Sequence, residues 1–114
     1  MKNIGFTGVI VSKVCGFGKE REKPQEISID VSIETDFQSV AENDDPSYGI
    51  DFRTIYTLIK TGLEGEIYTL EKAAVSIWQQ LKGLNNAGKV KVTVKKVAPP
   101  FKDEIKNSWV TVEE

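Results

Sequence analysis

The sequence predicts an α+β protein in which two helices pack on one face of a four-stranded antiparallel sheet. Two patterns support this prediction. Residues 27–34 and 90–95 alternate apolar with polar side chains, the period of strands with one buried and one wet face. Between them, apolar side chains recur at helical spacing over 52–63 and again over 70–81. Helices placed between two such strands can cover the apolar face of the sheet.

The outer strands have less regular patterns. Residues 4–14 have a β-rich composition, although Gly5 and Gly8 interrupt the alternation. A charged, glycine-containing loop follows at 16–24, and the last strand is predicted at 108–112. The predicted order of elements is therefore β-β-α-α-β-β.

Turn and capping residues delimit the two predicted helices. Residues 43–47, which read Asn-Asp-Asp-Pro-Ser, predict a turn. Asp51 is a suitable N-cap for the first helix, because its carboxylate can accept a hydrogen bond from a free N–H of the first turn. Gly62 or Gly65 is expected to end that helix, and Gly83 is expected to end the second.

Length and composition predict a single domain spanning residues 1–114. Apolar residues make up 39% of the chain and charged residues 28%, an ordinary globular balance. The net charge of −2 gives no bulk electrostatic reason to expect nucleic acid or an anionic membrane as partner. No apolar run is long enough for a membrane span, and the lone Cys15 excludes an intrachain disulfide. A cytoplasmic location is expected.

The sequence contains no histidine, which restricts the chemistry available to it. Serine–histidine and cysteine–histidine nucleophile systems are excluded, and so is zinc bound by histidine. Proton transfer would have to use aspartate, glutamate, lysine, tyrosine or an ordered water.

Two charged residues stand out by their positions. Lys96 is in phase with Val90, Val92 and Val94, which places it on the apolar side near a strand end. It must therefore either extend its head back to water or project into a pocket. Glu71 falls in the first turn of the second helix, where a carboxylate commonly complements the helix dipole. It could instead bind a flat ligand that presents two adjacent N–H groups.

Four segments together resemble the dihydroneopterin aldolase family, which has the tunnelling fold of other pterin- and purine-binding enzymes. The loop 19–25 is similar to the family's E-R-x-x-x-Q segment, and residues 44–45 with 49–53 are similar to its substrate-contacting turn and helix start. Residues 69–72 resemble its L-[LIV]-E-x-[LA]-A segment. Residues 92–100 resemble its V-x-V-x-K-x-x-P-P strand end.

The resemblance implies a pterin site and a retro-aldol reaction within folate biosynthesis that needs neither a metal ion nor a cofactor. Glu71, next to Leu70, would bind the amino and ring N–H groups of the pterin, whose parallel geometry suits a bidentate carboxylate. Lys96 would act through a water as general acid and base on the side chain of 7,8-dihydroneopterin, and Glu20 would hold the lysine or its water. Glu22 is close enough in the loop to be confused with Glu20, but the spacing from Gln25 favours Glu20.

The resemblance also implies an oligomer, a tetramer or an octamer. Family members close their small sheets into a barrel of four chains, and two such rings stack head to head. Ile50, Asp51 and Phe52 would then face a pocket to which an adjacent chain contributes Glu71 and Lys96. Closure would also pair the edge strands that a four-stranded sheet leaves open.

Phe52 is the departure from the family pattern, because the family has a tyrosine there whose hydroxyl protonates the enamine intermediate. A well-placed general acid is typically worth about 10²–10⁴ in rate. Without it the chain could be a slow aldolase, could use a water or a nearby tyrosine (Tyr48 or Tyr56), or could let the enamine react with oxygen to give 7,8-dihydroxanthopterin. The chain could also be an epimerase acting on dihydroneopterin or its triphosphate, or a non-catalytic pterin- or purine-binding protein.

Overall fold

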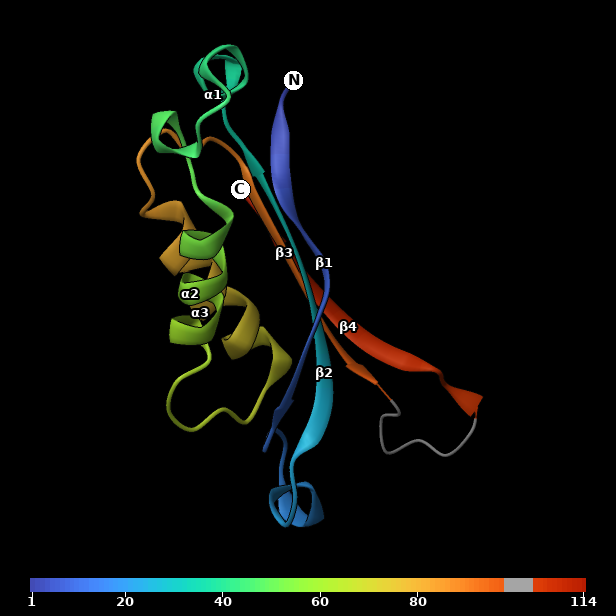
Figure 1. Cartoon of the computed structure of the whole chain (residues 1–114). Helices are drawn as coiled ribbons and strands as arrows, with labels where there is room; N and C mark the ends of the chain where they lie inside the picture. Colours follow the sequence, from blue (N-terminus) through green and yellow to red (C-terminus); the bar gives the residue numbers. More distant parts are fainter. Residues whose placement is uncertain (98–103) are drawn as a thin grey trace.

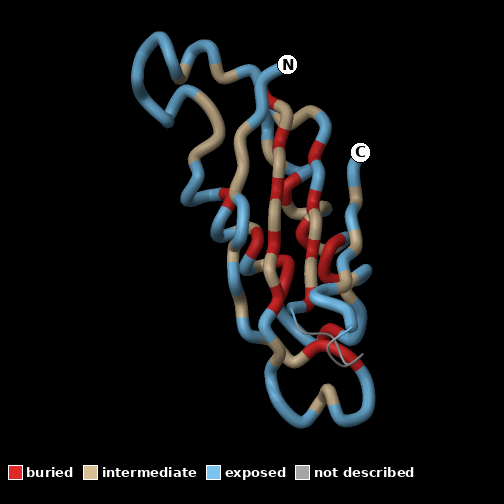
Figure 2. Tube along the Cα trace, turned by 90° about the vertical axis from the view of Figure 1, so that its right-hand side faces the viewer, coloured by how far each residue is buried: buried red, intermediate tan, exposed pale blue. Residues whose placement is uncertain are grey.

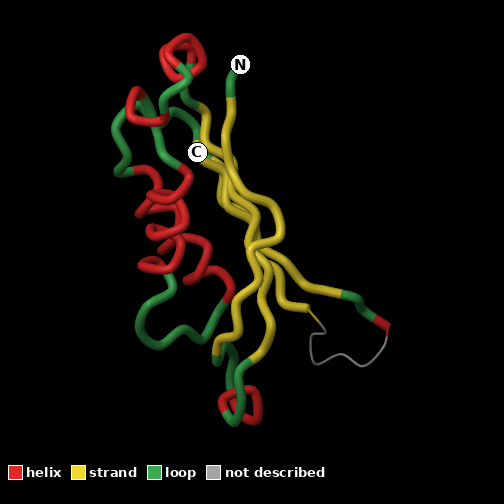
Figure 3. The backbone as a smooth tube through the Cα atoms, in the orientation of Figure 1, coloured by secondary structure: helices red, strands yellow, loops and turns green. Residues whose placement is uncertain are grey.

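The computed structural model describes residues 1–97 and 104–114, and Figure 1 shows the predicted α+β architecture. One antiparallel sheet has the strand order β1-β2-β3-β4. The strands are β1 (Asn3–Lys13), β2 (Gln25–Glu34), β3 (Val90–Val97) and β4 (Asn107–Glu113). The two longer helices are α2 (Phe52–Gly62) and α3 (Leu70–Lys82), and both lie on one side of the sheet (Figure 3). The predicted strand end at 98–100 lies outside the described residues.

The two central strands alternate in burial as their sequences alternate in polarity. Ile29 pairs with Val94 and Val31 pairs with Val92, and all four side chains are buried on the helix side. Polar residues occupy the opposite side, so buried and partly exposed positions alternate along both strands (Figure 2). This confirms the predicted sheet with one apolar face.

The strand β1 bends at a bulge between Phe6 and Val9. Gly8 lies in the bulge with a φ of 70°, a conformation that other residues rarely adopt, and its N–H donates a 2.7 Å hydrogen bond to Asp30. Gly8 therefore explains why the alternation is irregular in this strand. Strands β1 and β4 form the two edges of the sheet within one chain.

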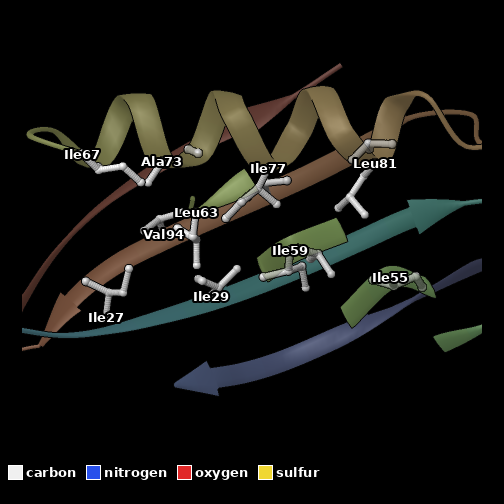
Figure 4. Packing of buried hydrophobic residues seen from close by; sticks show 14 of the residues in the cluster. Ile27, Ile29, Ile55, Ile59, Leu63, Ile67, Ala73, Ile77, Leu81 and Val94 are labelled. Atoms are coloured by element: carbon white, nitrogen blue, oxygen red, sulfur yellow. The ribbon is translucent and has the colours of Figure 1, made fainter. Parts of the chain in front are cut away.

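Capping and close packing fix the two longer helices. Asp51 caps α2 as predicted, accepting a 2.8 Å hydrogen bond from the N–H of Arg53. Gly62 is the last residue of α2, and a Cβ there would lie 2.8 Å from the Cα of Ile77, so its lack of a side chain lets α2 and α3 pack closely. Figure 4 shows Ile77 among the aliphatic side chains that fill the space between helices and sheet.

The segment between β2 and α2 was predicted as a turn, and this prediction is incomplete. It contains a short helix, α1 (Gln38–Asn43), and a 3-10 helix, η2 (Pro46–Tyr48). Neither contains a buried residue, so no apolar stripe marked them in the sequence. Asp44 ends α1 in the left-handed conformation, with a φ of 50°.

Not every apolar position of the helical spacing predicted over 52–63 is buried. Ile55 and Ile59 are buried, whereas Phe52 and Tyr56 are 49% and 48% exposed. Phe52 and Tyr56 are one turn apart and lie beside the buried pair Ile55 and Ile59 on the helix surface. Helical spacing alone does not show which of the two pairs faces the sheet. Among the described helices, none has the length and apolarity that crossing a membrane requires.

Candidate active site

Lys96 is buried on the helix side of the sheet, near the end of β3. It is only 7% exposed, and its ammonium group donates hydrogen bonds to two oxygen atoms. One is Oε2 of Glu20 at 2.7 Å, and the other is the backbone carbonyl of Cys15 at 3.0 Å. A buried ammonium is stable only with such partners, because removing it from water costs several kcal/mol. Lys95, the next residue, lies on the other face and pairs with Asp30 at 3.6 Å.

The partner carboxylate comes from the loop between β1 and β2. Glu20 lies in a 3-10 helix, η1 (Gly18–Arg21), and Gly16 makes room for its side chain. A Cβ at Gly16 would overlap the Glu20 side chain, and the φ of Gly16 is 123°, which favours glycine. The hydrogen bond from Lys96 holds the pKa of Glu20 below its usual value, against the opposing effect of burial.

The thiol of Cys15 lies beside this ion pair but takes no part in it. The thiol is free and buried, and burial raises its pKa although the charge of Lys96 acts in the opposite direction. It is the carbonyl of Cys15, and not the thiol, that contacts Lys96. A backbone acceptor of this kind leaves no mark in the sequence, and it was not among the predicted site residues.

The segment that leads into α3 is attached to the same loop. Ile67 forms a parallel β-bridge with Cys15, and its carbonyl accepts a 2.8 Å hydrogen bond from Arg21. The guanidinium of Arg21 also lies over the ring of Tyr68, 4.1 Å from its centroid, and Phe17 stacks on that ring at 5.2 Å. These contacts fix the start of α3 next to the Lys96–Glu20 pair.

Glu71 lies exposed in the first turn of α3, with Leu70 half-buried beside it. Thr69 caps the helix by accepting a 3.1 Å hydrogen bond from the N–H of Lys72. Glu71 takes part in none of the ion pairs among the described residues. Its carboxylate is therefore open to solvent, at a helix end where the dipole favours negative charge.

Ile50, Asp51 and Phe52 form a second group at the start of α2. The ring of Phe52 packs edge-on against Phe6 at 5.6 Å. A cavity of about 260 Å³ lies between this group and the β2–α1 connection. Its lining is mostly apolar and includes Ile4, Phe37, Val40, Ile50 and Phe52.

Asp51 is already engaged within its own chain. It binds the guanidinium of Arg53 at 2.9 Å as well as capping the helix, and the hydrogen bond from the Arg53 side chain lowers the pKa of Asp51. Both side chains of the pair lie near the surface. Asp51 is thus a helix cap in this structure, and its contact with a substrate stays a prediction.

One chain keeps the two groups apart. Helices α2 and α3 are consecutive and pack side by side (Figure 1), and Phe52 and Glu71 belong to their respective first turns. The two helices run in opposite directions (Figure 1), so their first turns lie at opposite ends of the pair, separated by the length of α2, which spans 11 residues at about 1.5 Å each. The structure therefore joins Lys96 with Glu20 near the start of α3 and does not bring Phe52 to them.

Comparison with known proteins agrees with this architecture. The family model for dihydroneopterin aldolase (FolB) matches residues 7–113, so the chain belongs to the dihydroneopterin aldolase family. No curated protein matches the chain in sequence. The family match confirms the resemblance inferred from the four sequence segments, and the similar solved structures confirm the tunnelling fold.

Three solved structures illustrate the likeness in fold. A putative dihydroneopterin aldolase from Vibrio cholerae has a TM-score of 0.89 and 16% identity, over 100% of this chain and 97% of that one. The Escherichia coli dihydroneopterin aldolase in complex with neopterin has a TM-score of 0.88 and 20% identity, over 100% and 99%. A Burkholderia dihydroneopterin aldolase bound to guanine has a TM-score of 0.83 and 16% identity, over 99% and 89%.

The ion pair predicts a specific pH dependence of stability. Because the pKa of Glu20 is lowered in the folded chain, its contribution is fully present above its unfolded pKa and is lost as the pH falls through the folded pKa. Glu20→Gln should therefore lower the free energy of unfolding at pH 7 by roughly 1–3 kcal/mol. The difference from wild type should shrink below about pH 4.5. Urea unfolding of wild type and Glu20→Gln from pH 3 to 7 measures this difference in the free energy of unfolding.

Glu22→Gln is the matched control, since Glu22 is exposed two residues away in the same loop. It should change the free energy of unfolding little at any pH. If the two variants behave alike, the Lys96–Glu20 hydrogen bond does not stabilise the fold.

Proposed function

We propose that the protein is a dihydroneopterin aldolase that cleaves 7,8-dihydroneopterin into 6-hydroxymethyl-7,8-dihydropterin and glycolaldehyde, in folate biosynthesis. The observation that carries the proposal is the buried Lys96, held by Glu20 beside the segment that leads to Glu71. Membership of the family supplies the reaction type. The proposal covers residues 1–114 as one domain acting in the cytoplasm, and the free thiol of Cys15 is compatible with a reducing compartment.

The hydrogen bonds of Lys96 suit it to proton transfer. An ammonium group has three N–H donors, and among the described residues Glu20 and Cys15 occupy two of them. We propose that the remaining position on the nitrogen binds a water that contacts the substrate. In the proposed reaction Lys96 acts as the base in its neutral amine form. It takes a proton from this water while the water takes the proton of the side-chain 2′-hydroxyl, and the bond between C1′ and C2′ breaks. Glycolaldehyde leaves, and the electron pair forms an enamine on the ring, which is protonated at C1′ to give the hydroxymethyl product.

Glu71 is proposed to bind the pterin ring. A pterin presents its amino group and an adjacent ring N–H on one edge, and a carboxylate can accept both hydrogen bonds at once. Guanine, found in the Burkholderia enzyme, presents the same pair of donors. The exposure of Glu71 and its place in the first turn of α3 favour this role, and Leu70 would contact the ring beside it.

An oligomer is proposed to complete the site. Strands β1 and β4 are the open edges of the sheet, and pairing β1 of one chain with β4 of the next would close a barrel. Ile50, Asp51 and Phe52 would then face the Glu71 and Lys96 of a neighbouring chain. The separation of the two groups within one chain supports this arrangement, in which a ring has four chains and two rings form an octamer.

A second candidate activity follows from Phe52, which lacks the hydroxyl of the family's tyrosine. An enamine that is protonated slowly can react with dioxygen instead. The balanced products are then 7,8-dihydroxanthopterin, glycolaldehyde and formic acid, the last derived from C1′. An epimerase would instead return the aldehyde to the enamine with inverted configuration at the side-chain carbon, and a binding protein would give no product.

Lys96→Ala tests the aldolase proposal when it is compared with wild type and Lys95→Ala. Incubation with 7,8-dihydroneopterin and chromatography of the products should show glycolaldehyde release by the wild type. Lys96→Ala should lose about 10²–10⁴ in kcat, the usual worth of a general acid or base. Lys95→Ala should keep its rate, because Lys95 faces the other side of the sheet and pairs with Asp30. Equal loss in the two lysine variants would contradict the assigned role.

Phe52→Tyr tests which product the site makes. Restoring a hydroxyl at this position should raise the fraction of 6-hydroxymethyl-7,8-dihydropterin formed under air, at the expense of 7,8-dihydroxanthopterin. Oxygen consumption and product ratio, measured under air and under nitrogen, separate the aldolase from the oxygenase. A wild type that consumes no oxygen and yields only the hydroxymethyl product would sink the oxygenase hypothesis. Tyr56→Phe in the same assay shows whether Tyr56, one turn further along α2, supplies the proton.

Mixed oligomers test whether adjacent chains share the site. Lys96→Ala and Ile50→Glu should each be inactive alone, and co-expressed chains purified by two different tags should regain activity at up to about a quarter of their sites. The control pairs Lys96→Ala with Glu71→Ala, which lie in the same group and should not complement each other. No recovery in the first mixture, or a monomer by light scattering, would refute the shared site.

A further inference from the structure

We propose that Gln25 is a positioning residue for Lys96, because its side-chain amide holds the two residues whose oxygen atoms accept hydrogen bonds from the lysine. Gln25 is the first residue of β2 and is half-buried. It does not contact Lys96 in the structure. Its influence on the reaction rests on the proposed function, whereas its influence on the Lys96–Glu20 pair does not.

The amide of Gln25 binds the loop at three points. Its oxygen accepts a 3.0 Å hydrogen bond from the backbone N–H of Cys15. Its nitrogen donates to the carbonyl of Glu20 at 2.6 Å and to the carbonyl of Lys23 at 2.7 Å. Both N–H donors of the amide are therefore used, and its oxygen is used once.

These bonds join the same residues that bind Lys96. Cys15 is held at its N–H by Gln25, while its carbonyl receives Lys96. Glu20 is held at its carbonyl by Gln25, while its carboxylate receives Lys96. One amide thus fixes the separation of the two acceptors between which the ammonium lies.

Little else in the loop could fix that separation. The helix η1 buries no residue, so apolar packing does not hold it. Among the described residues, its backbone makes only short-range hydrogen bonds, from the N–H of Glu20 to the carbonyl of Phe17 and from the N–H of Glu22 to the carbonyl of Lys19. Arg21 ties the loop to Ile67, which sets its distance from α3 and does not join Glu20 to Cys15.

Gln25→Met tests the proposal because methionine keeps the length of the side chain and removes its three hydrogen bonds. The pKa of Glu20 should rise toward its ordinary value, since the hydrogen bond from Lys96 is the main cause of its depression. Carbon-13 NMR titration of the glutamate carboxyl groups measures this without substrate. In turnover of 7,8-dihydroneopterin, kcat should fall by up to about 100-fold through misplacement of the lysine. KM should change little, because Glu71 lies on another element.

Gln79→Met is the matched control, since Gln79 is exposed on α3 outside the site, and it should leave the titration and kcat unchanged. Gln25→Asn keeps the amide one methylene shorter and should shift the Glu20 titration in the same direction. If Gln25→Met fails to fold, the titration of Gln25→Asn decides whether Gln25 positions the Lys96–Glu20 pair.

Two failures can be told apart. If the Glu20 titration of both Gln25 variants matches that of wild type and only thermal stability falls, Gln25 is a structural residue and the proposal is overturned. If the wild type turns over no dihydroneopterin, the proposed function fails, while the Glu20 titration still decides whether Gln25 positions the pair.

Discussion

The buried ammonium of Lys96 imposes the strictest constraint on this structure. A charge at this depth needs nearby oxygen atoms, and the protein supplies a carboxylate and a backbone carbonyl from one loop. The loop must therefore approach the end of β3 closely. Gly16 allows the approach because any side chain there would collide with Glu20. The loop between β1 and β2 thus supplies both oxygen atoms that accept hydrogen bonds from the buried ammonium.

The sequence predicted those parts of the fold in which burial repeats with a regular period. Lys96 could be placed on the buried face because alternate residues of a strand share a face, and the structure agrees. Helix α1 could not be predicted, since it buries nothing and so has no apolar stripe. The helical spacing also did not separate the exposed Phe52 and Tyr56 from the buried Ile55 and Ile59. Periodicity identifies the apolar side of a helix but not how much of that side the sheet covers.

The candidate site was only partly accessible to the same reasoning. The loop 16–24 has no period, so Glu22 remained a competitor although the spacing from Gln25 favoured Glu20. In the structure it is Glu20 that contacts Lys96. The carbonyl of Cys15 has no side-chain signature and could not be inferred. Gln25 was visible as part of a family segment, but its three hydrogen bonds depend on how the loop folds back on β2. Hydrogen bonds made by backbone groups, such as those of Cys15, depend on the three-dimensional fold and leave no pattern in the sequence.

The separation of the two groups assigns different steps of the proposed reaction to different surfaces. The Lys96 end is charged and hydrogen-bonded, which suits ring recognition and the proton transfer that breaks the carbon–carbon bond. The Phe52 end is mostly apolar: the ring of Phe52 packs edge-on against Phe6, and the cavity beside it has a mostly apolar lining. A phenylalanine there leaves the groups proposed for bond cleavage intact and removes only a proton donor. In the proposed oligomer, the fate of the enamine would then depend on Phe52 of the neighbouring chain and on the access of water and oxygen to the pocket proposed between the two chains.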